Sequence, residues 1–295
     1  MRERLQLLSL AFYCCAKAHS ASLDAHEAEG GRVEGAPAHL DQQHMERCDP
    51  PFPPTVHQLV EVHSYCYLSA AGEYMRGLGA LYDKEEVLVA PPALVRCVLE
   101  HSARVVWLLD YDQQPEDRAA RTYLDLLMCT VERKKTSGRF SGKGSKQHRG
   151  NGRLLAHIRK EAETLFGEPV VDDKGEHRIR GQRIPGLEDC VAALLDQLPG
   201  NSALDPRGLY DRMSNLAHPM VYSQVETMAR TVEDGKVAFR LAVTPEDHQQ
   251  LAALAVDAFF AALGRVISYQ GWDCAPYDQW TKSALELLWA QRRSD

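Results

Sequence analysis

Hydrophobic side chains recur every three or four positions along most of this chain, the spacing that places them on one face of a helix. Thr55, Asp205 and Thr244 stand just before such stripes, where their side chains can accept hydrogen bonds from the first helical amides. The sequence therefore predicts a mainly α protein, a helical bundle. The predicted helices cover residues 55–81, 91–110, 117–132, 154–166, 186–198, 206–218, 245–269 and 277–292.

Two stretches depart from helical spacing and predict β-hairpins inserted into the bundle. In residues 225–243, Asp234-Gly235 separates two strand-like runs, and Asp-Gly readily adopts the left-handed geometry of a tight hairpin turn. In residues 170–184, a similar turn signal at 172–175 stands between two short runs. The predicted fold class is thus mainly α, with one or two inserted β-hairpins.

The first 54 residues differ from the rest of the chain. Residues 1–18 carry basic side chains near the start and an apolar run at 7–16, which favours an amphipathic helix and has a secretory signal as its alternative. Residues 19–54 are poor in large apolar side chains and predict a flexible linker. The predicted organisation is an N-terminal helix and linker at 1–54, followed by one helical domain at 55–295.

The composition is that of an ordinary soluble globular protein, with 25% charged and 44% hydrophobic residues. A net charge of −7 argues against nucleic-acid binding over the whole surface, although it leaves room for a local basic patch. The eight cysteines form no CxxC pair, which predicts reduced thiols and a cytoplasmic protein. Beyond residue 18, no segment approaches the about 18 apolar residues that span a bilayer, so we expect no membrane partner.

Histidine and cysteine side chains provide no recognisable metal-binding pattern. His57, His63 and Cys66 fall in one predicted helix at mixed spacing, and no second ligand pair follows nearby. We therefore expect these side chains to be structural, and we expect neither a metal site nor a cofactor.

A basic stretch at 133–153 contains eight Lys or Arg residues, five glycines and no acid. It predicts a mobile loop that contacts phosphates without sequence specificity, with a solvated surface loop as the alternative. Residues 138–145 are not a P-loop, because their glycine spacing is one residue short and Gly144 replaces the Ser or Thr that binds Mg²⁺. The predicted nucleic-acid-binding residues are Arg133, Lys134, Lys135, Arg139, Lys143, Lys146, Arg149 and Arg153.

The very apolar helix predicted at 91–110 carries one line of charge. Arg96, Glu100 and Arg104 recur every fourth residue and therefore share a face. Charges on a buried helix need partners. The line is either an internal ladder that holds helices together or a polar face turned toward the helix at 206–218.

The helix predicted at 206–218 has firm signals at both ends. Asp205 is a cap, Pro206 suits the first helical position, and Pro219 disfavours helical geometry at His218. The dipole of such a helix favours a protonated histidine at its C-terminal end, which would help His218 to act as an acid.

Polar side chains gather along this helix. Tyr210, Ser214 and His218 are four residues apart and share a face. Arg212 and His218 diverge by about 120° around the axis, while Asn215 lies three residues from each. A second copy of the helix would supply the missing geometry, so we expect a homodimer. Alternatively, these groups only satisfy one another at a junction of the bundle.

The spacing Arg212-x5-His218 resembles the R-x(4–6)-H signature of HEPN (higher eukaryote and prokaryote nucleotide-binding) domains. The chain is also similar to an uncharacterised bacterial branch of HEPN-like proteins, which carry an early Arg-x3-Glu…Trp helix and a later Tyr-x3-Ser-x3-His helix. The corresponding residues here are Arg96, Glu100, Trp107, Tyr210, Ser214 and His218. The resemblance covers 91–110 and 205–219, and the other helices in outline.

The resemblance implies RNA cleavage without a metal ion, often by toxins or antiviral defence effectors. The ribose 2′-hydroxyl attacks the adjacent phosphate, which requires proton transfer and stabilisation of the phosphorane charge. His218 would transfer protons, Arg212 would hold phosphate oxygens, and Asn215 or Ser214 would orient the RNA. The alternative is a non-catalytic HEPN-like module that binds a nucleotide or a protein. The supporting residues would be Tyr210, Arg96, Glu100 and Arg104.

Overall fold

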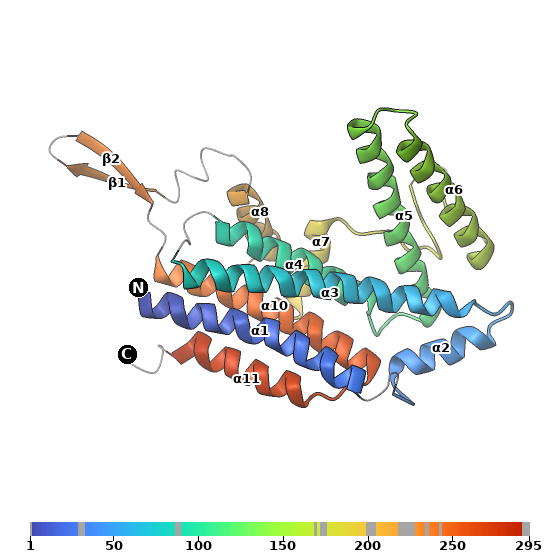
Figure 1. The fold of residues 1–295 in the computed structure, drawn as a ribbon, viewed down its shortest axis with the longest axis horizontal. Helices are drawn as coiled ribbons and strands as arrows, with labels where there is room; N and C mark the ends of the chain where they lie inside the picture. The colour runs from blue at the N-terminus through green and yellow to red at the C-terminus, as the bar shows by residue number, and fades with distance from the viewer. Residues whose placement is uncertain are drawn as a thin grey trace. The chain divides into compact units, whose positions relative to one another are not determined.

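Helices dominate the computed structural model, which confirms the prediction of a mainly α protein (Figure 1). The structure describes residues 2–28, 33–85, 90–167, 170–171, 176–198, 205–217, 228–233, 236–241 and 244–290. The chain divides into two compact units. Unit 1 comprises Met1–Pro37, Ser64–Trp107 and Leu187–Asp295, and unit 2 comprises Ala38–His63 and Leu108–Gly186.

The elements follow one another along the chain as a series of helices with one pair of strands. The helices are α1 (Arg2–Ala28), α2 (Pro37–Arg47), α3 (Pro54–Asp83), α4 (Ala90–Leu108), α5 (Pro115–Phe140), α6 (Lys146–Phe166), α7 (Leu187–Asp196), α8 (Pro206–Ala217), α10 (Pro245–Gln270) and α11 (Ala275–Trp289). The strands are β1 (Met228–Glu233) and β2 (Lys236–Leu241).

Unit 1 is a helical bundle in which α1 packs against α10 and α11 (Figure 1). The aromatic rings of Phe12 and Tyr82 meet edge to face, with 5.2 Å between their centroids. The Tyr82 hydroxyl and His248 Nδ1 are 3.0 Å apart and form a buried hydrogen bond. Burial therefore pairs the polar tips of core side chains across helices far apart in sequence.

The prediction of a flexible linker at 19–54 is wrong for the residues that the structure describes, because α1 extends to Ala28 and α2 occupies much of the remainder. Alanine-rich sequence has high helix propensity, which lets α1 continue where large apolar residues are few. Leu8 and Phe12 of α1 are buried in the core of unit 1. Such burial is what an amphipathic helix, the structure that the sequence favours for the first 18 residues, would show.

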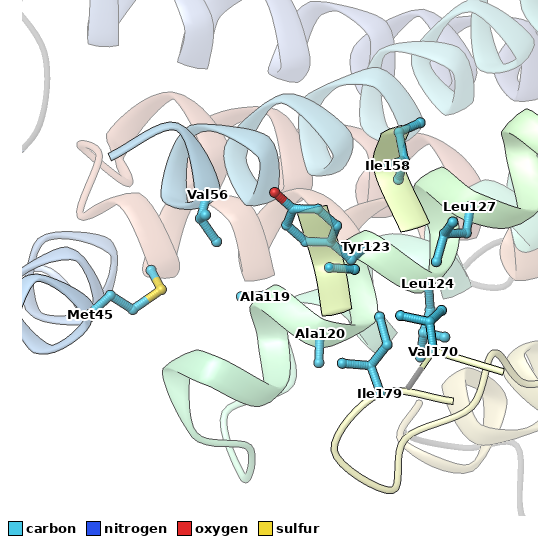
Figure 2. Close-up of a cluster of buried hydrophobic side chains, with 11 residues drawn as sticks. Met45, Val56, Ala119, Ala120, Tyr123, Leu124, Leu127, Ile158, Val170 and Ile179 are labelled. Atoms are coloured by element: carbon cyan, nitrogen blue, oxygen red, sulfur yellow. The ribbon is translucent and has the colours of Figure 1, made fainter. Parts of the chain in front are cut away.

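The core of unit 2 is formed by α5 together with parts of α2, α3 and α6 (Figure 2). Tyr123, Leu124 and Leu127 of α5 lie at its centre and are completely buried. Met45, Val56 and Ile158 cover them from the neighbouring helices. The apolar stripe that predicts the helix at 117–132 is thus the face that α5 buries.

An ion pair joins α2 to α5 inside unit 2. The Arg118 guanidinium donates to both carboxylate oxygens of Asp41, with Nε–Oδ2 and Nη2–Oδ1 distances of 2.8 and 2.6 Å. A further Arg118 nitrogen donates to the Asp110 carbonyl oxygen at 3.0 Å. Because both charged side chains are only 7% exposed, this fork is a buried ion pair that ties α2 to α5.

The prediction of a mobile basic loop at 133–153 is wrong, since α5 and α6 occupy all of this stretch except residues 141–145. Lys, Arg and Gln are good helix formers, and the Ser145 hydroxyl caps α6 by accepting a hydrogen bond from a backbone amide. Gly142 and Gly144 have φ values of 85° and 89°, which turn the chain between the two helices. The basic stretch is therefore the tip of a helical hairpin.

Strands β1 and β2 pair antiparallel, with Met228 opposite Leu241, inside the 225–243 segment for which a hairpin is predicted. The predicted turn residues at 234–235 lie outside the described residues.

The segment 170–184 is not a second hairpin in the part of it that the structure describes. Val171 pairs with His177 and Ile179 with Gln182 as isolated bridges rather than strands. Arg180 adopts a left-handed φ of 52°, so the chain turns back within two residues. Residues 172–175, the predicted turn, lie outside the described residues.

Helix α10 is long and apolar enough to cross a membrane by length and composition alone, which corrects the expectation that no later segment approaches this limit. In the structure, 61% of its most apolar window is buried inside the protein. The buried core helix of a soluble protein meets the same criteria, so this feature is weak support for a membrane span.

Candidate functional site

Helix α8 begins where the sequence predicts. The Asp205 carboxylate accepts a hydrogen bond from the Arg207 backbone amide at 3.1 Å, and Pro206 is the first helical residue. The helix continues to Ala217. His218 lies outside the described residues, so the structure does not place the predicted proton donor.

The predicted polar residues of α8 divide between two sides of the helix. Tyr210 and Met213 are buried, with 7% and 1% of their surface exposed. The Arg212 side chain is 64% exposed. Ser214 and Asn215 are half-buried. Helix α8 is thus anchored on one side, while Arg212 points to solvent on another.

Arg96 and Glu100 of α4 meet Tyr210 of α8 in a closed triangle. The Glu100 carboxylate accepts from Arg96 Nε at 2.7 Å and from the Tyr210 hydroxyl at 2.8 Å. An Arg96 guanidinium nitrogen donates to the Tyr210 oxygen at 3.2 Å, and its carbon lies 5.3 Å from the centre of the tyrosine ring. The structure therefore brings together Arg96, Glu100 and Tyr210, all predicted from the sequence as supporting residues.

Electrostatics keep Tyr210 and Arg96 of this triangle in one protonation state each. Burial raises the pKa of Tyr210, and the hydrogen bond to Glu100 raises it further against the opposing effect of Arg96. Burial alone would lower the pKa of Arg96, but its bond to Glu100 raises it overall. Tyr210 therefore remains a hydroxyl donor and Arg96 a cation near neutral pH, which suits a contact that positions α8.

Arg104 follows the same line of α4 but has a different neighbour. It is 8% exposed, and its guanidinium carbon lies 5.4 Å from the centre of the Trp107 ring. This distance is typical of a cation–π contact within one helix. The charged line of α4 thus has two parts. Arg96 and Glu100 form the triangle with Tyr210 of α8, and Arg104 pairs with Trp107 further along the helix.

Arg212 forms an ion pair with Asp247, with 3.8 Å between an arginine nitrogen and Oδ1. The other oxygen of Asp247 accepts from the backbone amide and hydroxyl of Thr244, at 3.0 and 2.7 Å, in a capping box at the start of α10. The Thr244 hydrogen bonds lower the pKa of Asp247, although burial opposes them. An exposed ion pair at this distance contributes little stability, so Arg212 can exchange Asp247 for a phosphate.

The basic hairpin, defined here as residues 133–153 of α5, α6 and their connection, displays nearly all its cations. Lys134 is half-buried, and the other seven predicted nucleic-acid-binding cations are exposed. Phe140 at the tip is 89% exposed, the highest exposure among the large hydrophobic side chains of the described residues. Asn151 of α6 donates to the Ser137 hydroxyl of α5 at 3.0 Å, which fixes the two helices against each other.

The exposed ring of Phe140 is a feature of the basic hairpin that a count of its charged residues does not reveal. Proteins that bind single-stranded nucleic acids place exposed aromatic rings beside cations, and the bases stack on these rings. Its sequence signal is a lone phenylalanine between Arg139 and Lys143 in a stretch that otherwise has no large apolar residue before Leu154. The basic hairpin belongs to unit 2 and the α8 group to unit 1, so they are two separate candidate regions.

Comparison with known proteins assigns no family to this chain. The chain matches no protein-family model, no curated protein and no solved structure.

Proposed function

We propose that this chain is a HEPN-like endoribonuclease of a toxin or antiviral defence type, which cleaves RNA without a metal ion. The observation that carries the proposal is the exposed guanidinium of Arg212 on a helix whose opposite side is anchored by Tyr210. A rigid support for one exposed cation is what stabilisation of a developing phosphorane charge requires.

The reaction follows from the groups on α8 and just after it. The ribose 2′-oxygen bonds to phosphorus while its proton passes to His218, and the bond from phosphorus to the 5′-oxygen breaks. The protonated His218 gives that proton to the departing 5′-oxygen, and a 2′,3′-cyclic phosphate remains. Arg212 neutralises the pentavalent intermediate through paired hydrogen bonds, and Ser214 or Asn215 orients the ribose.

A homodimer would complete this site. On an ideal helix the directions of Arg212 and His218 would differ by about 120°, so a second α8 across a two-fold axis would present its histidine to the first arginine. All eight cysteines are free thiols, in keeping with the reducing cytoplasm that we propose as the location.

The test uses the whole untagged protein with single-stranded RNA in excess chelator. We expect cleavage to proceed, with products that end in 2′,3′-cyclic phosphate. Intact RNA under these conditions, with protein in excess over RNA, would overturn the proposal.

The basic hairpin is proposed to hold the RNA. Its cations bind phosphates in any sequence, and stacking on Phe140 favours single strands because paired bases are not free to stack.

Two variants separate charge from stacking. Combined replacement of Arg139, Lys143 and Lys146 by alanine should reduce the slope of log affinity against log salt by about 2, since each phosphate contact in single strands contributes about 0.7. Phe140→Ala should weaken single-stranded RNA binding about 5- to 100-fold at constant salt. Fluorescence anisotropy with labelled RNA measures both.

Matched controls lie outside the basic hairpin. Lys282→Ala removes an exposed cation of α11, and Tyr111→Ala removes a 44% exposed aromatic ring in unit 2. Both should bind RNA like the wild type. Equal losses in the control and test variants would show that the hairpin has no special part in binding.

A non-catalytic module that binds a nucleotide or a protein is the second candidate. Asp247 favours the protein-binding form of this candidate, because this carboxylate already lies beside Arg212 and competes with any phosphate, including that of a nucleotide. It predicts intact RNA together with protection of α8 from hydrogen exchange when the nucleotide or protein is added.

A further inference from the structure

Three side chains with metal-binding chemistry meet at one end of α2 in unit 2. His44 Nε2 lies 2.9 Å from an oxygen of the Glu116 carboxylate, and Cys48 Sγ lies 3.6 Å from the same oxygen. All three ligand atoms are within 4.8 Å of one another. Such convergence of an imidazole, a thiol and a carboxylate is unlike a surface group of acids, because each residue supplies a different ligand type.

Local structure explains why these atoms converge. His44 lies in the last turn of α2 and Cys48 directly follows the helix, four residues later, so both side chains lie on the same side. The Cys48 thiol also donates to the His44 carbonyl oxygen at 3.5 Å, which continues the helical turn. Glu116 stands in the first turn of α5.

The two helices are held in place one turn away. Asp41 precedes His44 by three residues, and Arg118 follows Glu116 by two. Their buried fork, described above, ties α2 to α5 next to the three ligands. Ligand positions fixed by a neighbouring ion pair reduce the entropy lost when an ion binds.

We propose that His44, Cys48 and Glu116 bind a divalent transition-metal ion of the Zn²⁺ class through Nε2, Sγ and a carboxylate oxygen. Ligand atoms around a tetrahedral zinc ion lie about 3.3 to 3.6 Å apart, close to the distances seen here. Thiolate and carboxylate charges balance the ion, and a water molecule would complete the coordination. As the metal bonds form, the thiol proton passes to solvent, and the proton on His44 Nε2 leaves that nitrogen, with Nδ1 carrying the proton of the neutral ring.

The surroundings allow the ion to enter, because the side chains of His44 and Glu116 are 50% and 17% exposed. The site lies in unit 2 and is independent of the cleavage proposed for α8.

Cobalt(II) is the probe for this site, because it gives visible bands that report tetrahedral geometry and a near-ultraviolet band that reports a thiolate ligand. Untagged, chelator-stripped and reduced protein should bind one Co²⁺ with both signals, and Zn²⁺ should displace it. Cys48→Ser should abolish the thiolate band. His44→Ala and Glu116→Gln should each weaken Zn²⁺ binding at least about tenfold.

The controls are the exposed cysteines Cys66 and Cys274. Replacement of either by serine should leave the cobalt spectrum unchanged. As a second measurement, Zn²⁺ should slow alkylation of Cys48 but not of Cys274. The proposal is overturned if Co²⁺ gives no thiolate band, or if that band persists in Cys48→Ser.

Discussion

Replacing Arg212 by alanine is expected to slow RNA cleavage about 10²–10³-fold, the usual loss when one preorganised stabiliser of transition-state charge is removed. The side chain is 64% exposed and lies 3.8 Å from the Asp247 carboxylate, so the fold should lose almost nothing. His218→Ala should slow cleavage about 10²–10⁴-fold through loss of proton transfer. Single-turnover rates in chelator measure both effects, and thermal unfolding checks that the fold is retained.

Arg207 is the matched control, because it is another exposed arginine of α8, paired with Asp189 at 2.8 Å. Arg207→Ala should cleave RNA at the wild-type rate. Arg212→Lys should fall between wild type and alanine, since lysine keeps the charge but loses the planar fork. Wild-type rates in both Arg212→Ala and His218→Ala would remove α8 from the mechanism.

Arg118→Ala is expected to destabilise unit 2 by about 3–5 kcal/mol, because it removes the guanidinium that donates two hydrogen bonds to the buried Asp41 carboxylate. Both side chains are 7% exposed, so water cannot replace the lost bonds readily. Hydrogen exchange of α5 amides measures the effect in unit 2 by itself, whereas global unfolding of a chain with two units mixes both.

Two further variants isolate the cause. Arg139→Ala removes an exposed arginine of the same helix and should change stability by less than about 0.5 kcal/mol. The double replacement of Asp41 by leucine and Arg118 by methionine should recover most of the stability lost in Arg118→Ala, since no buried charge remains. If the double variant is less stable than the single one, unpaired charge is not the source of the loss.

The start of α8 and the buried face of α5 could be predicted because their signals are local. Asp205 and Pro206 mark where a helix begins regardless of tertiary contacts, and α8 begins there. The apolar spacing in α5 identifies the face that it buries. Arg96 and Glu100 were predicted to share a face by the same rule, but only the structure identifies Tyr210 as their common partner.

The basic hairpin shows how amino-acid composition alone can predict the wrong secondary structure. Glycines and like charges in 133–153 suggest a loop, yet glycine only weakens a helix by about 1 kcal/mol per residue. Packing of α6 on α5, through contacts such as Asn151 with Ser137, offsets that cost. These contacts join residues 14 positions apart and leave no local pattern.

Helix α2 was missed for a related reason. Its buried side chains include Asp41, which a hydropathy pattern assigns to the surface. The partner that makes this burial favourable, Arg118, is 77 residues away. Once α2 is assigned to a linker, His44 and Cys48 cannot be recognised as neighbours of Glu116, so the proposed metal ligands are hidden as well.

The packing of α1 against α10 and α11 sets the order in which the protein can mature on the ribosome. All of unit 2 is made before α10 and α11, and at about 5–20 residues per second the surface of α1 that these two helices cover stays uncovered by them for roughly 10 to 50 s. That part of its apolar face is meanwhile open to chaperones, whereas Phe12 can already meet Tyr82 of α3. Ribosome-bound chains that end near residue 240 should therefore show α5 protected from protease and α1 still cleavable. Protection of α1 at that length would mean that it finds other partners first.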